Sequence, residues 1–140
     1  MKIFLDSSVV LAACGRPVGA SHAIFDLAGA QGWRLLAGDY VLREVEKNVQ
    51  NRLSHAANRE WILLRPALVV VADELTHPWP VVFPAAKDRP VLFTAAAVAD
   101  VLLTLDRADF GGVMAAGFYG LRVMKPGDFL RRERAAGRLQ

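Results

Sequence analysis

Short apolar runs alternate with longer stretches of helical periodicity along the chain. The runs at residues 2–5, 34–37, 68–72, 101–104 and 122–124 have the length and composition of β-strands. Helical stretches separate most of them, and this alternation favours a parallel sheet with helices on both faces. The pattern therefore predicts an α/β protein, a three-layer α/β/α sandwich around a mostly parallel sheet of four to five strands.

The clearest helical signal follows the second predicted strand. Val41, Val45, Val49 and Leu53 recur every four residues, which places them on one face of an amphipathic helix. Further helices are expected from Ser7-Ser8 through residue 14, over residues 20–30, over residues 89–99 and from Pro126 onward.

A proline-rich stretch precedes the predicted helix at residue 89. Residues 77–90 contain four prolines and are predicted to form a loop at the rim of the sheet. The loop carries Trp79, which is either a surface on which a nucleic-acid base stacks or a core residue. We favour the core.

Composition narrows the class of protein. A length of 140 residues suits one domain, predicted to span residues 1–140, and 54% apolar with 22% charged residues excludes a disordered chain. The mean hydropathy of +0.26 raises the question of a membrane segment. The longest stretches without a charged residue, 75–86 and 110–121, are shorter than the roughly 20 residues that a span requires, so no membrane association is expected.

The N-terminus and the cysteine content indicate a cytoplasmic protein. The N-terminal apolar run ends at Asp6 and does not resemble a signal peptide. Cys14 is the single cysteine, which excludes an intramolecular disulfide and a cysteine-based zinc site. Its apolar neighbours suggest a core residue rather than a nucleophile.

The net charge of +3 is unevenly distributed. Six basic and two acidic residues lie from Arg122 onward, which leaves the first 121 residues with a net charge of −1. The basic residues Arg131, Arg132, Arg134 and Arg138 form either a patch that meets phosphates or the solvated face of a last helix.

Four acidic residues stand near the predicted carboxyl ends of strands. Asp6 follows the first strand, and Asp106 lies two residues beyond Thr104 in the fourth. Glu44 lies early in the amphipathic helix, and Asp88 precedes the helix that leads into the fourth strand. Because the carboxyl ends of parallel strands share one crevice, these four side chains are expected to converge there.

Crowded carboxylates raise one another's pKa values unless a cation lies between them. A ligand set of oxygens alone selects Mg²⁺ or Mn²⁺, which assist the attack of water on a phosphodiester. Each acid also has a structural alternative, since Asp6 and Asp88 can cap helices and Glu44 can pair with Lys47. Their conjunction favours metal-dependent phosphoryl chemistry.

Five segments, in their order along the chain, carry a family resemblance. They read FLDSSV from Phe4, VLREV from Val41, KDRPVL from Lys87, ADVLLTLD from Ala99 and YGLRVMKPGDFL from Tyr119. Together they resemble the PIN-domain nucleases, especially the single-domain VapC-type toxins of bacterial toxin–antitoxin pairs.

The resemblance implies roles for particular residues. The catalytic metal site would consist of Asp6, Glu44, Asp88 and Asp106, with Asp109 as a further metal ligand. Whether Asp88 or Asp109 binds the ion directly is left open. Substrate contacts would come from Ser8, Thr104, Arg89 and Arg107, with Arg131, Arg132 and Arg134 as an outer track. The three histidines have no metal-ligand spacing between them.

The resemblance also implies a function. It predicts a Mg²⁺- or Mn²⁺-dependent endoribonuclease that hydrolyses RNA, acts as a toxin, forms a homodimer and binds a small antitoxin protein. One alternative is an inactive PIN-fold module that holds RNA or a protein partner. A phosphatase with Asp6 as the nucleophile would need a second Asp two residues later, where the chain has Ser8.

Overall fold

The computed structural model describes residues 1–52 and 54–139; Leu53, predicted to extend an apolar helix face, lies outside the described residues. The first half of the chain forms β1 (Lys2–Leu5), α1 (Ser7–Gly15), α2 (Ala20–Gln31), β2 (Arg34–Gly38), α3 (Asp39–Arg52), α4 (His55–Leu64), η1 (Arg65–Ala67) and β3 (Leu68–Val71). The second half forms η2 (Ala86–Asp88), α5 (Arg89–Val98), β4 (Val101–Leu103), α6 (Arg107–Ala116), β5 (Arg122–Met124) and α7 (Pro126–Ala135).

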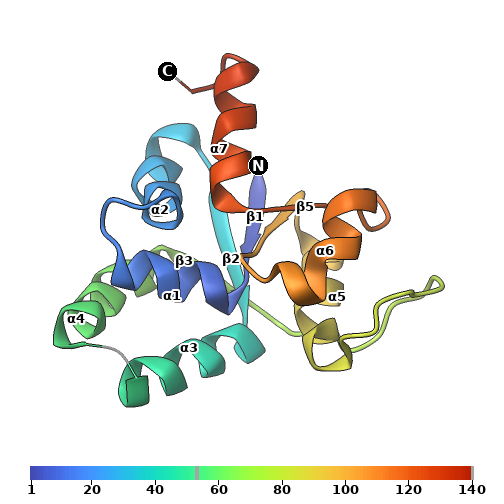
Figure 1. The fold of residues 1–140 in the computed structure, drawn as a ribbon, viewed down its shortest axis with the longest axis horizontal. Helices are drawn as coiled ribbons and strands as arrows, with labels where there is room; N and C mark the ends of the chain where they lie inside the picture. Colours follow the sequence, from blue (N-terminus) through green and yellow to red (C-terminus); the bar gives the residue numbers. More distant parts are fainter. Residues whose placement is uncertain (53, 140) are drawn as a thin grey trace.

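The strands form one parallel sheet. Its order is β3-β2-β1-β4-β5 over the described part of the chain, and every neighbouring pair is parallel. Helices α1, α2 and α4 lie on one side of the sheet and α5 and α6 on the other (Figure 1). The predicted three-layer α/β/α fold is confirmed.

The strand order creates a topological switch point. The chain moves outward from β1 through β2 to β3 and then returns to the other side of β1, where β4 and β5 are added. The connection that follows β1 and the connection that follows β4 therefore leave the sheet in opposite directions. This divergence opens a crevice at the carboxyl ends of the two strands. Asp6 directly follows β1 and Thr104 directly follows β4.

The middle of the sheet is the hydrophobic core. Ile3, Phe4, Leu102 and Leu103 on β1 and β4 have no exposed surface. Polar side chains are therefore confined to the strand ends. Cys14 is buried as well, and burial raises the pKa of its thiol to about 11, which fits the predicted core residue.

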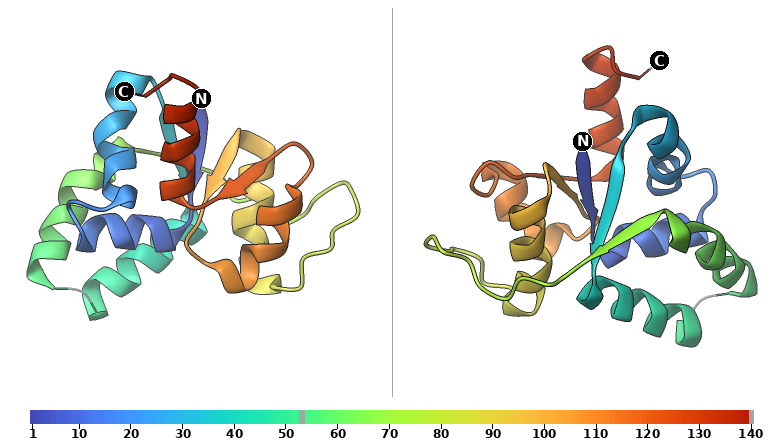
Figure 2. Two further views of the ribbon diagram at one scale, coloured as in Figure 1. Left: turned by 45° about the horizontal axis from the view of Figure 1, so that its top comes forward. Right: turned by 180° about the vertical axis from the view of Figure 1, so that it is seen from behind.

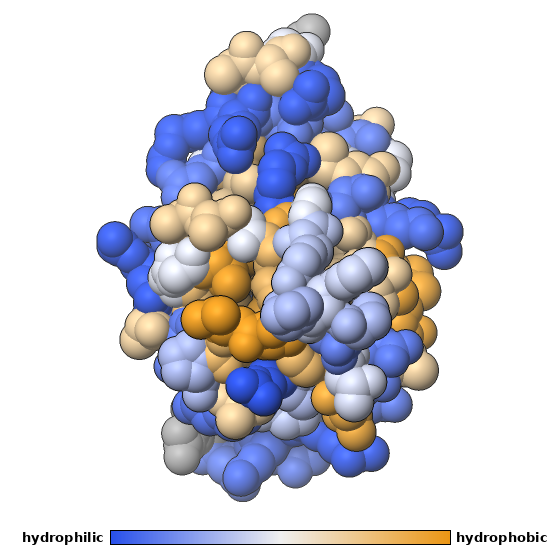
Figure 3. Space-filling view, turned by 90° about the vertical axis from the view of Figure 1, so that its right-hand side faces the viewer, coloured by the Kyte–Doolittle hydropathy of each residue, from blue (hydrophilic) through white to orange (hydrophobic). Residues whose placement is uncertain are grey.

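A proline-rich arm leaves β3 and projects from the domain on the side of α5 (Figures 1 and 2). The core position favoured for Trp79 is wrong, because the side chain is 61% exposed. The flanking prolines Pro78 and Pro80 hold it away from the sheet, and its ring lies 6.5 Å from that of Tyr119. The Tyr119 hydroxyl donates to the Pro80 carbonyl and fastens the arm. On the face that the arm projects from, residues of intermediate hydropathy lie next to a patch of hydrophobic surface (Figure 3).

Of the basic C-terminal residues, Arg131, Arg132 and Arg134 lie on α7, and Arg138 lies three residues beyond its end at Ala135. This helix packs against α2, and it rises from the end of β5 toward the chain's N-terminus (Figure 1). Arg138 donates two hydrogen bonds to the buried Glu133, and Arg131 pairs with Asp128. Because α7 runs back toward the amino ends of the strands, Arg134 and Arg138 lie near those ends rather than at the crevice.

In the described part of the chain, no single helix is long and apolar enough to cross a membrane. Only α1 and α2 taken together reach that length and composition, with a bend of 96° between them.

Candidate metal centre

Asp6 is fixed by hydrogen bonds from three donors. Its Oδ1 accepts from the Ser7 amide at 2.9 Å, which caps α1. Its Oδ2 accepts from the Ser8 hydroxyl at 2.9 Å and from the Thr104 hydroxyl at 2.8 Å. The Asp6 carboxylate therefore caps α1 and also lies at the switch point, and the sequence had predicted these as alternatives.

The two hydroxyls also hold the segment after β4. Ser8 Oγ accepts from the Leu105 amide at 3.0 Å, and Thr104 Oγ1 accepts from the Asp106 amide at 3.1 Å. Ser8 and Thr104 therefore position acidic residues on both strands. Their predicted contact with substrate stays a prediction.

The pKa of Asp6 is raised above its usual value. Burial of the side chain, only 6% exposed, is the largest cause. The hydrogen bonds from Thr104, Ser8 and Ser7 lower the pKa, and the negative charge of Glu44 raises it further. A nearby cation would relieve this cost of ionisation.

Asp88, Asp106 and Asp109 form a carboxylate cluster. One oxygen from each lies within 4.8 Å of the other two. Asp106 caps α6 by accepting from the Asp109 amide at 3.0 Å, so the two share the first turn of one helix. Asp88 comes from η2, on the chain's return from the arm.

Asp88 provides the observation that most strongly favours a cation site. Its Oδ2 is buried and has no hydrogen-bond partner among the described residues. Although Asp88 precedes α5, its side chain makes no capping hydrogen bond, so the capping alternative is not realised. Leaving such an oxygen unpaired costs about 1–3 kcal/mol, which a bound cation would offset.

Asp88 and Asp109 shift each other's pKa values. Burial, followed by the neighbouring Asp109, raises the pKa of Asp88 to about 7. The pKa of Asp109 is lowered, chiefly by its interaction with the neighbouring Asp88 carboxyl group. Lys87 Nζ lies 3.7 Å from Asp109 Oδ2, and the charges of Asp109 and Asp88 raise the lysine pKa.

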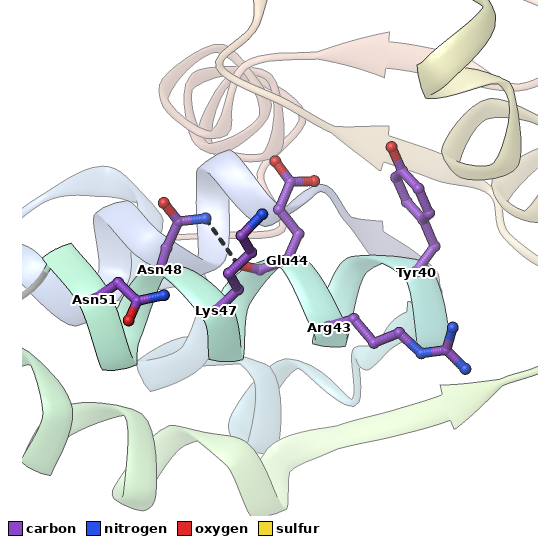
Figure 4. Close-up of a pocket in the computed structure, with 6 residues that line it drawn as sticks. All are labelled: Tyr40, Arg43, Glu44, Lys47, Asn48 and Asn51. Atoms are coloured by element: carbon purple, nitrogen blue, oxygen red, sulfur yellow. Dashed lines mark hydrogen bonds between the residues drawn. The ribbon is translucent and has the colours of Figure 1, made fainter.

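Glu44 approaches the same edge from α3, where its side chain is exposed (Figure 4). It forms no ion pair with Lys47 in the described structure, and its charge acts on Asp6 and Tyr40. Asp73 fixes the start of α3, because its Oδ2 accepts from the Tyr40 amide at 2.9 Å. Gly38 leaves room for Asp73, since a Cβ there would lie 2.2 Å from Asp73 Oδ1.

The predicted acidic residues are arranged in two groups. The cluster brings together Asp88, Asp106 and Asp109, while Asp6 and Glu44 act on it or on each other through their charges. Asp109 was expected only as a further ligand. Its spacing of three residues from Asp106 on a helix is the signal that predicts their proximity.

The predicted basic residues have different surroundings. Arg89 donates through Nε and Nη2 to the Phe83 carbonyl, at 3.3 and 3.2 Å, and so anchors the returning arm. Arg107 is exposed at the start of α6. Substrate binding by either residue stays a prediction. Lys87, which the sequence did not single out, lies closest to the cluster.

The histidines lie outside the cluster. His22 contacts Asp26 at 2.9 Å and Glu60 at 2.6 Å, which raises its pKa and joins α2 to α4. His77 stacks on Tyr119 in the arm, with ring centres 5.0 Å apart. Neither His22 nor His77 is part of the carboxylate cluster among the described residues.

The donor set suits a hard divalent cation. The candidate ligands are carboxylate oxygens, and one of them is buried without a partner among the described residues. Mg²⁺ and Mn²⁺ prefer such oxygens over nitrogen or sulfur. The residues present therefore fit the cation that the sequence predicted.

Two solved structures are similar to this chain. VapBC2 from Rickettsia felis, bound to a DNA fragment from its promoter, matches with a TM-score of 0.61 and 14% identity, over 88% of this chain and 97% of that chain. VapC20 from Mycobacterium tuberculosis, a toxin that cleaves the sarcin-ricin loop, matches with a TM-score of 0.50 and 19% identity, over 86% of this chain and 98% of that chain. No protein-family model and no curated protein matches the sequence. At these identities the likeness establishes the fold, and the predicted PIN-like fold is confirmed.

Proposed function

We propose that this chain is a Mg²⁺- or Mn²⁺-dependent endoribonuclease that hydrolyses RNA phosphodiester bonds, and that it is the toxin of a toxin–antitoxin pair. The observation that carries the proposal is the buried Oδ2 of Asp88, unpartnered among the described residues, within a cluster of carboxylates. The cluster lies at the switch point of a sheet, where open α/β proteins bind their ligands. The likeness to two VapC-containing structures supports the same proposal.

Asp88, Asp106 and Asp109 would hold the cation, with Asp6 and Glu44 at the same edge. When bound, the cation supplies positive charge that stabilises the phosphate under attack and lowers the pKa of a water molecule.

The protein itself orients the remaining groups. Asp6 Oδ2 already accepts from two hydroxyls, whereas Oδ1 accepts only from the Ser7 amide. Asp6 Oδ1 therefore retains a lone pair that can accept a proton from the attacking water. Asp106 offers a second acceptor, because the capping hydrogen bond uses only its Oδ1.

An acidic crevice repels RNA, so cations must hold the substrate. Lys87 is 76% exposed beside Asp109, and Arg107 is exposed at the start of α6. We assign both to the phosphates that flank the scissile bond.

The partners follow from the toxin assignment. We expect a small antitoxin protein whose C-terminal segment covers the acidic crevice, and a homodimer formed through helix faces. We place the protein in the cytoplasm, where its RNA substrate occurs.

Cleavage of RNA in the presence of Mn²⁺ tests the nuclease assignment. Wild-type protein is expected to cut, whereas EDTA, Asp6→Asn and Asp106→Asn are each expected to abolish cutting. Asp128→Asn is the matched control, since that carboxylate pairs with Arg131 on α7 and is not part of the carboxylate cluster. Equal cleavage by wild type and both site variants would refute the mechanism.

Expression in a bacterium tests the toxin assignment. We expect the chain to arrest growth, and co-expression of the neighbouring upstream reading frame to restore it. Full nuclease activity without toxicity would point to an RNA-processing enzyme. Binding of Mn²⁺ without any cleavage would instead support the inactive binding module.

A further inference from the structure

The polar face of α3 borders a cavity of about 680 Å³ (Figure 4). The lining residues follow a helical repeat, so they share one face of the helix; they are Tyr40, Arg43, Glu44, Lys47, Asn48 and Asn51. The opposite face carries Val41, Val45 and Val49, which are buried. The cavity is therefore lined by the hydrophilic side of an amphipathic helix.

Four of the lining residues are nitrogen donors of hydrogen bonds. Arg43 and Lys47 are exposed, and neither forms an ion pair within residues 1–52 and 54–139. Asn48 donates to the Glu44 carbonyl at 2.8 Å, which fixes its amide beside the cavity. Figure 4 shows Lys47 alongside Glu44, while Arg43 extends toward the Tyr40 end of the helix.

The cavity adjoins the metal centre. Glu44 lines it and acts electrostatically on Asp6. Tyr40 also lines it, and the pKa of its hydroxyl is raised by burial and then by the charges of Glu44 and Asp88. Tyr40 and Glu44, which link the cavity to the carboxylates, both lie on the first two turns of α3.

Several other basic groups contact acidic or carbonyl groups elsewhere in the structure. Arg89 is tied to the Phe83 carbonyl, Lys87 lies at Asp109, and Arg131 and Arg138 pair with acids on α7. Arg43 and Lys47 on α3 differ from these groups. They flank the crevice on the side of Glu44, and neither has an acidic partner in the described structure.

We infer that Arg43, Lys47, Asn48 and Asn51 bind the phosphodiester backbone of a single RNA strand that leads to the carboxylates. The inference deepens the proposed function and rests on it. The guanidinium of Arg43 can bind a phosphate through two parallel hydrogen bonds, and Lys47 contributes a mobile point charge. The amides donate to phosphate oxygens without adding charge. A charged groove of this kind follows a single strand without reading its sequence.

The test is the salt dependence of RNA binding. A fluorescently labelled single-stranded RNA is titrated with protein in EDTA, where cleavage is not expected, at several salt concentrations. For a single strand, the slope of log K against log [salt] is negative, and every phosphate that the protein neutralises adds about 0.7 to its magnitude. The double variant Arg43→Ala/Lys47→Ala neutralises two fewer phosphates and is expected to reduce the magnitude of the slope by about 1.4. Its affinity at low salt should fall at least about tenfold, because it cannot form these charge-assisted hydrogen bonds.

The matched control removes two charges at the opposite end of the sheet. Lys2 and Arg34 are exposed at the starts of β1 and β2, so Lys2→Ala/Arg34→Ala should leave the slope unchanged. Both double variants should keep the wild-type melting temperature and Mn²⁺ affinity, which shows that the fold and metal centre are intact.

Each other outcome overturns the inference. An unchanged slope in the α3 variant, with cleavage by the wild type, refutes the track and leaves the nuclease assignment standing. An equal reduction of the slope in the control variant shows that only total charge matters. Competition by a polyglutamate peptide as strong as that by RNA of equal charge assigns the cavity to an acidic peptide. A wild type that neither cuts nor binds RNA refutes the proposed function as well.

Discussion

Thr104 Oγ1 donates a 2.8 Å hydrogen bond to Asp6 Oδ2 and so joins the carboxyl ends of β4 and β1. The same hydroxyl accepts from the Asp106 amide at 3.1 Å. One buried side chain therefore orients an acidic residue on each side of the switch point. This hydrogen bond therefore contributes both to the stability of the fold and to the geometry of the candidate site.

Replacing Thr104 with valine removes the hydroxyl and keeps the shape of the side chain. Asp6 would lose one of its hydrogen bonds while remaining buried, so the free energy of unfolding should fall by about 1–3 kcal/mol. Thr104→Ser retains the hydroxyl and should preserve most of the stability. Urea unfolding in EDTA measures both. A valine variant as stable as wild type would show that Asp6 does not need this donor.

Gly38→Ala should destabilise the protein and disturb α3. The added Cβ would lie 2.2 Å from Asp73 Oδ1, and Asp73 holds the Tyr40 amide at the start of α3. We expect a decrease of about 1–3 kcal/mol in the free energy of unfolding, typical of overpacking, together with weaker RNA cleavage because Glu44 is displaced.

Gly112→Ala is the matched control for this substitution. Nothing lies within 4 Å of a Cβ at Gly112, which is inside α6, so alanine there should stabilise the protein by about 0.5–1 kcal/mol. Thermal denaturation of both variants compares them. Equal stability of the two would contradict the role of Gly38.

Without divalent cations, the stability contributed by Asp88 should fall as the pH rises. Its pKa is about 7 in the folded protein and near 3.8 in an ordinary environment, so between these values the folded state binds the extra proton. Raising the pH through this window removes that proton and favours unfolding. Melting temperatures from pH 4 to 8 in EDTA should therefore decline more steeply for wild type than for Asp88→Asn. Parallel profiles would show that Asp88 titrates normally.

Mn²⁺ should stabilise the wild-type protein through the cluster. At a concentration of one hundred times Kd, binding to the folded state alone adds about 2.7 kcal/mol. Asp109→Asn should lose most of this gain if Asp109 binds the ion directly, and Asp128→Asn should retain it. Calorimetric titration with Mn²⁺ gives the affinities. An equal affinity in wild type and Asp109→Asn would show that Asp109 does not bind the ion directly.

The strands and two of the acidic positions could be predicted because they depend on local patterns. Short apolar runs predicted the five strands within about one residue, and the sheet order brings their ends together as the parallel topology requires. Asp6 and Asp106 lie at or just beyond strand ends, so their placement needed only the topology. Helix α6 was missed, because Gly111 and Gly112 weaken its helical signal.

The remaining features depend on contacts that local patterns do not encode. Trp79 is apolar, yet the prolines around it and the hydrogen bond from Tyr119 hold the arm outside the core. Glu44 was expected among the ligands, but its position depends on the course of α3 over the sheet edge, and the tight cluster contains Asp109 instead. Arg89 was assigned to substrate, and only the tertiary structure shows its two hydrogen bonds to Phe83.

The pairing of β1 with β4 sets when the carboxylate centre can form during synthesis. Asp6 is made before β4, whereas Asp106 and Asp109 follow β4 and lie 100 and 103 residues after Asp6 in the chain. A nascent chain that ends before β4 has no Thr104 hydroxyl to donate to Asp6 and no carboxylate cluster. Long-range parallel pairing is also a slow step of folding. The carboxylates of the candidate metal centre therefore come together only after β4 and the segment that follows it have been synthesised.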